Sequence, residues 1–153
     1  FYMFKGEMPE GYGLTGPNGN SSPLNIVEFR NIENPDKIVD VEIDEGTAQE
    51  QFDKAAAKDK YTAGDDVKLG KYTWKTLNFT WNKQPSVVLY TDIAEGLYAE
   101  VTLYETTLDD ADIKAFLEGV EFATDYDAAH KAGMDATVEK FAADNSLTLW
   151  EAK

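Results

Sequence analysis

The sequence contains no cysteine and only one histidine, His130. Disulfide bonds, thiolate nucleophiles and zinc–sulfur sites are therefore excluded. A Ser-His-Asp triad would have to use His130, but no Gly-x-Ser-x-Gly sequence accompanies it, and we expect this side chain to lie exposed on a polar helix face. Transition-metal sites usually recruit two or more such ligands, so the sequence predicts neither a metal site nor a cofactor.

Basic residues are scarce, because 14 lysines and arginines stand against 29 aspartates and glutamates, for a formal net charge of -15. A surface of this sign repels phosphate backbones and anionic membranes, so we expect no nucleic-acid partner. Long apolar runs are also lacking, and we predict no transmembrane segment. The chain starts with FYMFKG rather than with a methionine, and we interpret it as a mature or trimmed form from which any targeting segment has been removed.

The abundant acidic residues gather at three places, each of which has an ordinary explanation. Those at 40–44 alternate along one predicted strand, as solvated residues on an outer face do. Those at 109–112 gather at the start of a predicted helix, where the helix dipole favours negative charge. Asp125 and Asp127 form a pair without the further ligands and the glycine of a calcium loop. We therefore assign no metal ligand and no catalytic residue.

At 153 residues the chain has the length of one domain, and its hydrophobic pattern changes between strand and helix periods. Period-two alternation predicts strands at 23–31, 37–44, 84–92 and 96–105, the first two joined as a hairpin by the Asn-Pro-Asp turn at 34–36. Helical spacing predicts helices at 46–61 and 106–122, capped by Thr47 and Thr107, and a third at 125–145 before a short edge strand at 146–150. The predicted fold class is α+β, an antiparallel sheet with helices packed on it.

The stretch GKYTWKTLNFTWN, residues 70–82, holds two of the three tryptophans. Its large side chains switch parity, since Tyr72 and Trp74 are even-numbered and Leu77, Phe79 and Trp81 are odd-numbered. We favour a one-residue bulge near 75–76, which would bring both sets to one buried face and make Leu77, Phe79 and Trp81 core residues. The alternative is a continuous strand with aromatic side chains on both faces.

These elements, in this order, resemble the PsbP/Mog-like α/β sandwich. An opening of the type Pro-x-Gly-Tyr lies at Pro9, Gly11 and Tyr12, and the closing element runs from Thr107 to Asp110, followed by Ile113 and Leu117. The resemblance implies a single domain, 1–153, with a sandwich over 1–122. Residues 123–153 have no counterpart in the family, and we expect them to form a helical extension that docks on the domain and shields part of the aromatic sheet.

The family shares no catalytic residues, so the resemblance transfers none to this chain. Many bacterial lipoproteins and exported domains are similar to it. The resemblance therefore implies an extracellular or cell-surface location, and it leaves open a lipid anchor in the full-length protein.

Two functions of different class remain open. We favour a non-catalytic exported module of a bacterial surface that meets a protein or surface-polymer partner. Aromatic residues outside the core would serve that function, and the alternation leaves Trp74, Tyr98, Tyr104 and Trp150 as candidates. The alternative is a small hydrolase with two acidic residues in a cleft, which two carboxyl groups of raised pKa in one pocket would favour.

Overall fold

The structure is a computed structural model, and it describes residues 4–5, 7–16, 26–125, 127 and 138–151. Eight strands form one antiparallel sheet in the spatial order β2-β3-β4-β9-β8-β7-β5, with β6 also paired to β7. Their bounds are β2 Tyr12–Gly16, β3 Ile26–Asn31, β4 Ile38–Glu45, β5 Thr62–Ala63, β6 Val67–Leu69, β7 Tyr72–Trp81, β8 Gln84–Ala94 and β9 Leu97–Tyr104. Two further short strands, β1 (Phe4–Lys5) and β10 (Glu121–Phe122), pair with each other.

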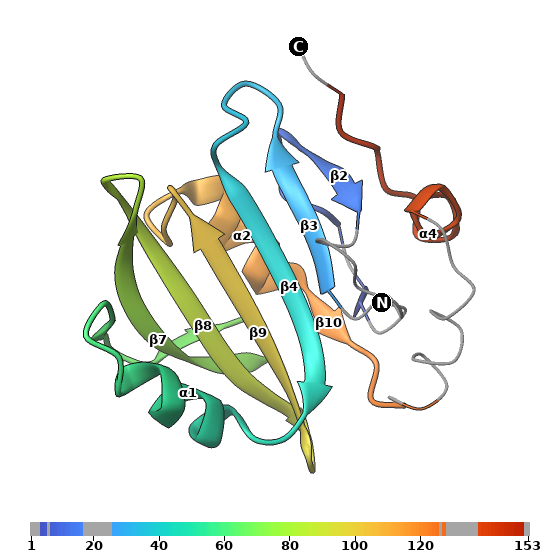
Figure 1. The fold of residues 1–153 in the computed structure, drawn as a ribbon. Coiled ribbons are helices and arrows are strands. Elements are labelled where there is room, and N and C mark those ends of the chain that lie inside the picture. The colour runs from blue at the N-terminus through green and yellow to red at the C-terminus, as the bar shows by residue number, and fades with distance from the viewer. Residues whose placement is uncertain (1–3, 6, 17–25, 126, 128–137, 152–153) are drawn as a thin grey trace.

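Helices lie on both faces of this sheet (Figure 1). Helix α1 (Ala48–Ala56) crosses β7, β8 and β9 on one face, and α2 (Ala111–Gly119) packs on the opposite face. A third helix, α4 (Val138–Asp144), lies beside β2 at the far edge of the sheet. The predicted α+β class is therefore confirmed. Within the described residues, no helix has the length and apolar character needed to cross a membrane.

The main core lies between the sheet and α2. Alternate residues of β4, Val39, Val41 and Ile43, are buried there, as their period-two spacing predicts. Ile113, Phe116 and Leu117 of α2 close the core from the other side. The ring centroids of Phe116 and Phe29 lie 5.8 Å apart, edge to face.

Side-chain hydrogen bonds to the first turn explain where helices α1 and α2 begin. Thr47 caps α1 by accepting a hydrogen bond from the amide of Glu50, as predicted. The α1 amide of Ala48 also donates to Asp92 Oδ1 at 2.8 Å, which ties the helix to the end of β8. The predicted cap of α2 is wrong, because Asp110 rather than Thr107 accepts from the first turn, at the amide of Asp112. Asp110 lies three residues further along, and its carboxylate also suits the positive end of the helix dipole.

Strand β7 runs without the predicted bulge. Its register against β8 is continuous from Lys75 to Trp81, so odd-numbered and even-numbered side chains stay on opposite faces. Trp74 joins the α2-side core, whereas Leu77 and Phe79 are buried under α1. Trp81 is 46% exposed, so its predicted place in the core is also wrong. Aromatic rings can be buried on both faces because helices cover both.

The chain turns from β7 into β8 through Asn82 and Lys83, which both have positive φ, at 50° and 66°. This is the backbone twist of a tight hairpin turn, and asparagine tolerates it well. The turn ends the strand directly after Trp81. It therefore holds this tryptophan at the tip of the hairpin.

The C-terminal segment returns to the opposite edge of the sheet. Phe141 and Ala142 of α4 are buried in the main core. Beyond α4, the amide of Leu14 donates to the carbonyl of Thr148, and the amide of Trp150 donates to the carbonyl of Leu14, both at 2.8 Å. Leu149 thus forms a bridge parallel to β2.

This contact needs a glycine at position 13, because a Cβ there would lie 2.5 Å from the Cα of Trp150. The part described from Val138 to Glu151 lies at the β2 edge, far from the aromatic strand β7, so these residues do not shield the aromatic sheet as predicted. Most of the helix predicted at 125–145, with His130, lies outside the described residues, as do 17–25.

Candidate functional site

The α1 side of the sheet divides into two regions with different chemistry. Under and beside α1, strands β7 to β9 carry a second apolar cluster that includes Leu77, Phe79 and Tyr98. Further along the same face, β4 carries Asp40, Glu42 and Asp44, which are half-buried. The predicted acidic outer face of this strand is therefore present. We call these regions the aromatic region and the acidic region.

A groove of about 360 Å³ opens in the aromatic region, between the C-terminal end of α1 and the sheet. Its size lies within the range typical of small-ligand sites. Its walls are aromatic rings from the loop after α1 and from strands β7, β8 and β9, namely Tyr61, Phe79, Trp81, Tyr90 and Tyr104. Lysines border it on the α1 side, namely Lys54, Lys58 and Lys60.

The rings in the groove support one another by edge-to-face contacts. The ring centroid of Tyr104 lies 5.1 Å from that of Trp81 and 6.0 Å from that of Phe79, and Tyr61 lies 5.4 Å from Phe79. The Lys60 ammonium lies 4.9 Å from the centre of the Tyr61 ring. These contacts hold a set of aromatic side chains in place, so that a ligand would meet an ordered wall.

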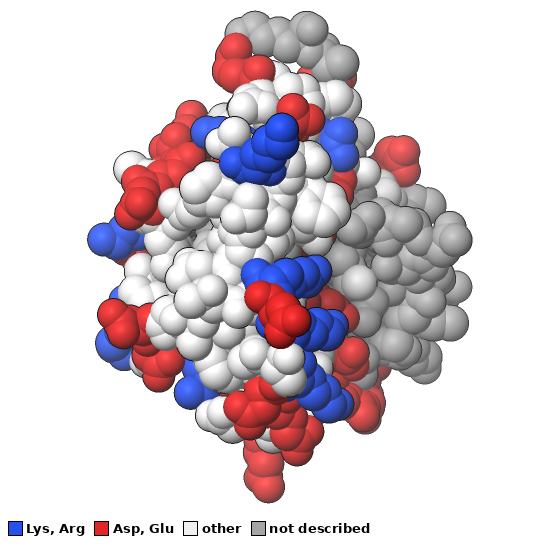
Figure 2. Space-filling view, turned by 60° about the vertical axis from the view of Figure 1, so that its left-hand side comes forward, with Lys and Arg blue, Asp and Glu red and all other residues white. Residues whose placement is uncertain are grey.

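Trp81 is the member of this wall that reaches solvent. Among the described residues, the exposed large hydrophobic side chains are Trp81 and Leu149, at 46% and 40%. Leu149 lies at the β2 edge, whereas Trp81 lies at the mouth of the groove. Figure 2, which brings this side of the molecule forward, shows Lys and Arg side chains beside a broad uncharged area.

A pair of carboxyl groups joins the aromatic and acidic regions. Glu100 of β9 lies directly opposite Glu42 of β4, and it forms the floor of the groove. Burial, followed by the charge of Glu100, raises the pKa of Glu42 to about 7. Burial also raises the pKa of Glu100, although hydrogen bonds with Tyr90 and Glu42 oppose this. The pair therefore holds a proton near neutral pH.

The predicted hydrolase geometry is not met by this pair. Glu42 and Glu100 hydrogen-bond to each other, and of the two only Glu100 lines the groove. The two carboxyl groups of a glycosidase stand about 5–10 Å apart, on either side of the bond that is cut. Among the residues that the structure describes, no group of three acidic or histidine side chains is placed so as to hold a metal ion.

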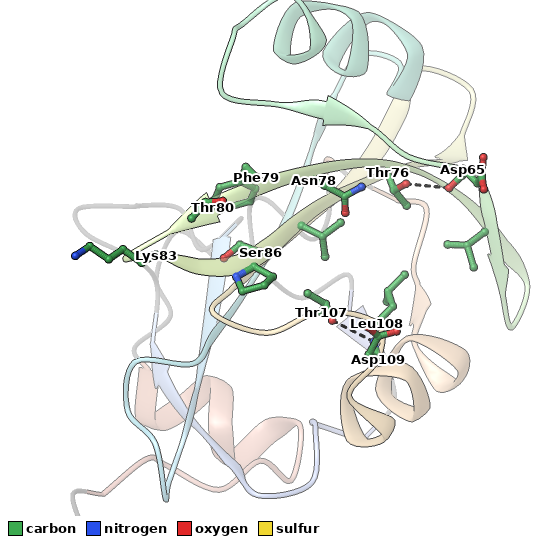
Figure 3. Close-up of a pocket in the computed structure, with 13 residues that line it drawn as sticks. Asp65, Thr76, Asn78, Phe79, Thr80, Lys83, Ser86, Thr107, Leu108 and Asp109 are labelled. Carbon is green, nitrogen blue, oxygen red and sulfur yellow. Dashed lines mark hydrogen bonds between the residues drawn. The ribbon is translucent and has the colours of Figure 1, made fainter.

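A larger hollow, of about 520 Å³, lies on the other side of the β7–β8 hairpin (Figure 3). Hydroxyl and amide side chains such as Thr76, Asn78 and Thr107 line it. Several of these groups already have partners, since Thr76 Oγ1 donates to the carbonyl of Asp65 at 2.8 Å and Thr107 Oγ1 accepts from the amide of Asp109. Among the described residues that line it, Phe79 is the one aromatic residue. We therefore regard the groove beside α1 as the better candidate site.

The structure does not bring the four predicted site residues together. Trp74 is fully buried in the main core and Tyr98 is 5% exposed under α1, so the expectation that they lie outside the core is wrong. Tyr104 lines the groove. Trp150 lies at the β2 edge, where Arg30 stacks 5.6 Å from its ring and its Nε1 donates to the carbonyl of Asn31.

Trp81 and the lysines are not among the site residues that the sequence predicts. The bulge predicted in β7 places Trp81 in the core. The spacing of Lys54 and Lys58, four residues apart on one helical face, was a usable signal. The place of Lys60 depends on how the chain leaves the helix, which no local pattern indicates.

No protein-family model and no curated protein matches this sequence. Solved structures do show similarity. A PsbP protein from the cyanobacterium Synechocystis shares 16% identity over 78% of this chain and 86% of its own, with a TM-score of 0.47. LpqN of Mycobacterium tuberculosis, which is involved in cell envelope biogenesis, shares 11% identity over 79% of this chain and 83% of its own, with a TM-score of 0.44.

A protein of Bacteroides thetaiotaomicron has a TM-score of 0.47 and 11% identity over 80% of this chain, which spans about half, 46%, of that protein. A PsbP protein is thus among the structures to which this chain is similar, as the sequence resemblance predicted. At these values the similarity concerns the fold alone.

Proposed function

We propose that this protein is a non-catalytic binding module that takes its ligand in the groove beside α1. The observation that carries the proposal is the exposed Trp81, held edge to face on Tyr104 at the mouth of an aromatic groove. A ring of this size left in water costs free energy, which a bound ligand would recover. Aromatic residues in pre-formed sites are typical of the positions that dominate binding.

The module is also proposed to act at a bacterial cell surface, with a protein or a surface polymer as partner. This part of the proposal is supported by the resemblance of the sequence to the PsbP/Mog-like sandwich, which many exported bacterial domains share. Protease treatment of intact cells that produce the full-length protein tests it. Loss of the protein from intact cells is expected, and complete protection until lysis would contradict a surface location.

The ligand site is tested by titration of ¹⁵N-labelled protein with neutral disaccharides, acidic disaccharides and aromatic carboxylates. We expect at least one class to shift the amide signals of β7, β9 and the end of α1. Trp81→Ala should weaken that binding by about tenfold or more, because it removes the exposed ring. Leu149→Ala is the matched control, since it removes a similarly exposed side chain at the β2 edge, and it should leave the affinity unchanged.

A small hydrolase is the second candidate, because burial raises the pKa of Glu100, which lines the groove, as in an acid catalyst, although its hydrogen bond with Glu42 departs from the geometry of a glycosidase pair. The same disaccharides distinguish it, since a hydrolase would convert them to monosaccharides during the titration. Turnover that disappears in Glu100→Gln would favour the hydrolase. Binding without turnover would favour the module, and no shift of any groove signal with any class would contradict the ligand site.

A further inference from the structure

We infer that the ligand of the groove is an acidic saccharide, whose ring lies against Trp81 and Tyr104 and whose acidic group lies at Lys54 and Lys58. The inference rests on the proposed function and adds the chemical class of the ligand. Three features of the groove support it, namely the lysines, the arrangement of rings and hydrogen-bonding groups, and the proton that Glu42 shares with Glu100 at the floor.

The lysines are unusual in a protein with a net charge of -15. Lys54 and Lys58 are exposed, and in the described part of the chain neither forms an ion pair, although Lys71, Lys75 and Lys140 do. These two cations make the α1 side of the groove more positive than its sheet side, where burial, followed by charges that include Asp40 and Glu100, raises the pKa of Tyr104. An anionic ligand is therefore favoured there over a neutral or cationic one.

The walls combine flat rings with groups that form hydrogen bonds. Trp81 and Tyr104 present ring surface, while Gln51, Thr102 and the tyrosine hydroxyl groups present donors and acceptors. Sugar rings have C–H groups on their faces and hydroxyl groups around their edges, so one molecule can satisfy both kinds of surface. A volume of about 360 Å³ suits a ligand of one or two sugar units.

The floor of the groove would repel an anion if its carboxyl group were charged. Burial raises the pKa of Glu100, and its hydrogen bonds with Glu42 and Tyr90 place a proton within this group of side chains. Both hydrogen bonds lower the pKa of Glu100, so Glu100 accepts them, and the proton of the carboxyl pair lies on Glu42. The pair therefore carries one negative charge rather than two, which weakens its repulsion of an acidic saccharide at this point.

Calorimetric titration with digalacturonate and with a sulfated disaccharide tests the inference, and the dimethyl ester of digalacturonate serves as the uncharged probe. We expect at least one acidic probe to bind at least about tenfold more tightly than the ester, because the ester lacks the charge that the lysines attract. The double variant Lys54→Gln/Lys58→Gln should weaken that binding about three- to tenfold, as expected for exposed charges. Lys114→Gln is the control, since this exposed lysine lies on α2, on the other face of the sheet, and it should have no effect.

The outcomes separate this inference from the proposed function. If the ester or another neutral disaccharide binds at the groove as tightly as the acidic probes, the acidic class is wrong and the binding module stands. If indole-3-acetate binds at the groove and the acidic saccharides do not, the saccharide is wrong and the module again stands. If none of these compounds shifts a groove signal, the proposed function fails together with the inference.

Discussion

On the α2 side of the sheet, strands β4, β8 and β9 present Val39, Leu89 and Val101, each at most 1% exposed. On the α1 side, the same strands present Asp40, Tyr90 and Glu100. Alternation with period two makes this difference possible, since neighbouring residues of one strand serve separate faces. The α2 face is largely apolar, so it stabilises the fold. The α1 face mixes rings, lysines and carboxyl groups, and α1 covers only part of it, which leaves a surface that can meet a ligand.

The largest effect expected from this difference is at Trp74, on the α2 face. Trp74→Ala should lower the free energy of unfolding by about 3–5 kcal/mol, because it leaves a large cavity in a fully buried core. Urea denaturation followed by circular dichroism measures this change. A loss below about 1 kcal/mol would contradict the burial of Trp74 and restore it as a candidate binding residue.

Phe79→Ala tests the α1 face in the same way. We expect a loss of about 3 kcal/mol, at the lower end of the range for a buried phenylalanine, because the ring lies beside the open groove. The same urea titration applies, and binding to the groove should weaken as well. A loss clearly larger than that of Trp74→Ala would contradict the view that the α1 face contributes less to stability.

The carboxyl pair gives the α1 face a pH dependence near neutral pH. The folded-state pKa of Glu42 is raised above its ordinary value of 4.5 to about 7. The folded protein therefore holds more protons than the unfolded chain between these values, and stability falls as pH rises through this window. Glu42→Gln removes this titration. At pH 8.5 the free energy of unfolding of the variant should therefore exceed that of the wild type by roughly 1–2 kcal/mol, a range already reduced for solvent screening.

The two proteins should have nearly equal stability at pH 4, where Glu42 is protonated in both states. Urea midpoints measured at both pH values give the difference. A variant whose stability differs from that of the wild type by the same amount at both values would contradict the raised pKa.

Trp81→Ala should have the smallest effect on stability. The exposed ring contributes its edge contact with Tyr104, so we expect a loss of about 0.5–1 kcal/mol. Thermal unfolding beside Leu149→Ala provides the comparison. A loss above about 2 kcal/mol would show that Trp81 belongs to the folded core rather than to a ligand site.

The sequence predicted the strands well because a strand buried on one face alternates apolar and polar residues with a period of two. Strands β4 and β9 have regular alternation, and their predicted faces are the observed ones. Strand β7 was misread because its rings are buried on both faces. Its pattern depends on which helix covers which face, and this is a tertiary property that no local window contains.

The candidate site was predicted less well than the fold, for a related reason. Tyr104 was identified because its strand alternates, but the exposure of Tyr98 was wrong, since α1 covers it. The pairing of Glu42 with Glu100 depends on the register between β4 and β9, which are separated by 50 or more residues along the chain. Alternation placed both residues on polar strand faces and could not show that they meet.

The bridge between Leu149 and Leu14 has a consequence for the behaviour of the protein in concentrated solution. An uncovered sheet edge offers free amide and carbonyl groups to any other extended chain, which promotes association between copies. The segment at 148–150 uses the amide and the carbonyl of Leu14, the central residue of β2. The C-terminal segment therefore protects this edge from pairing with a strand of another molecule. A chain that ends before Thr148 should aggregate more readily even where its core is intact.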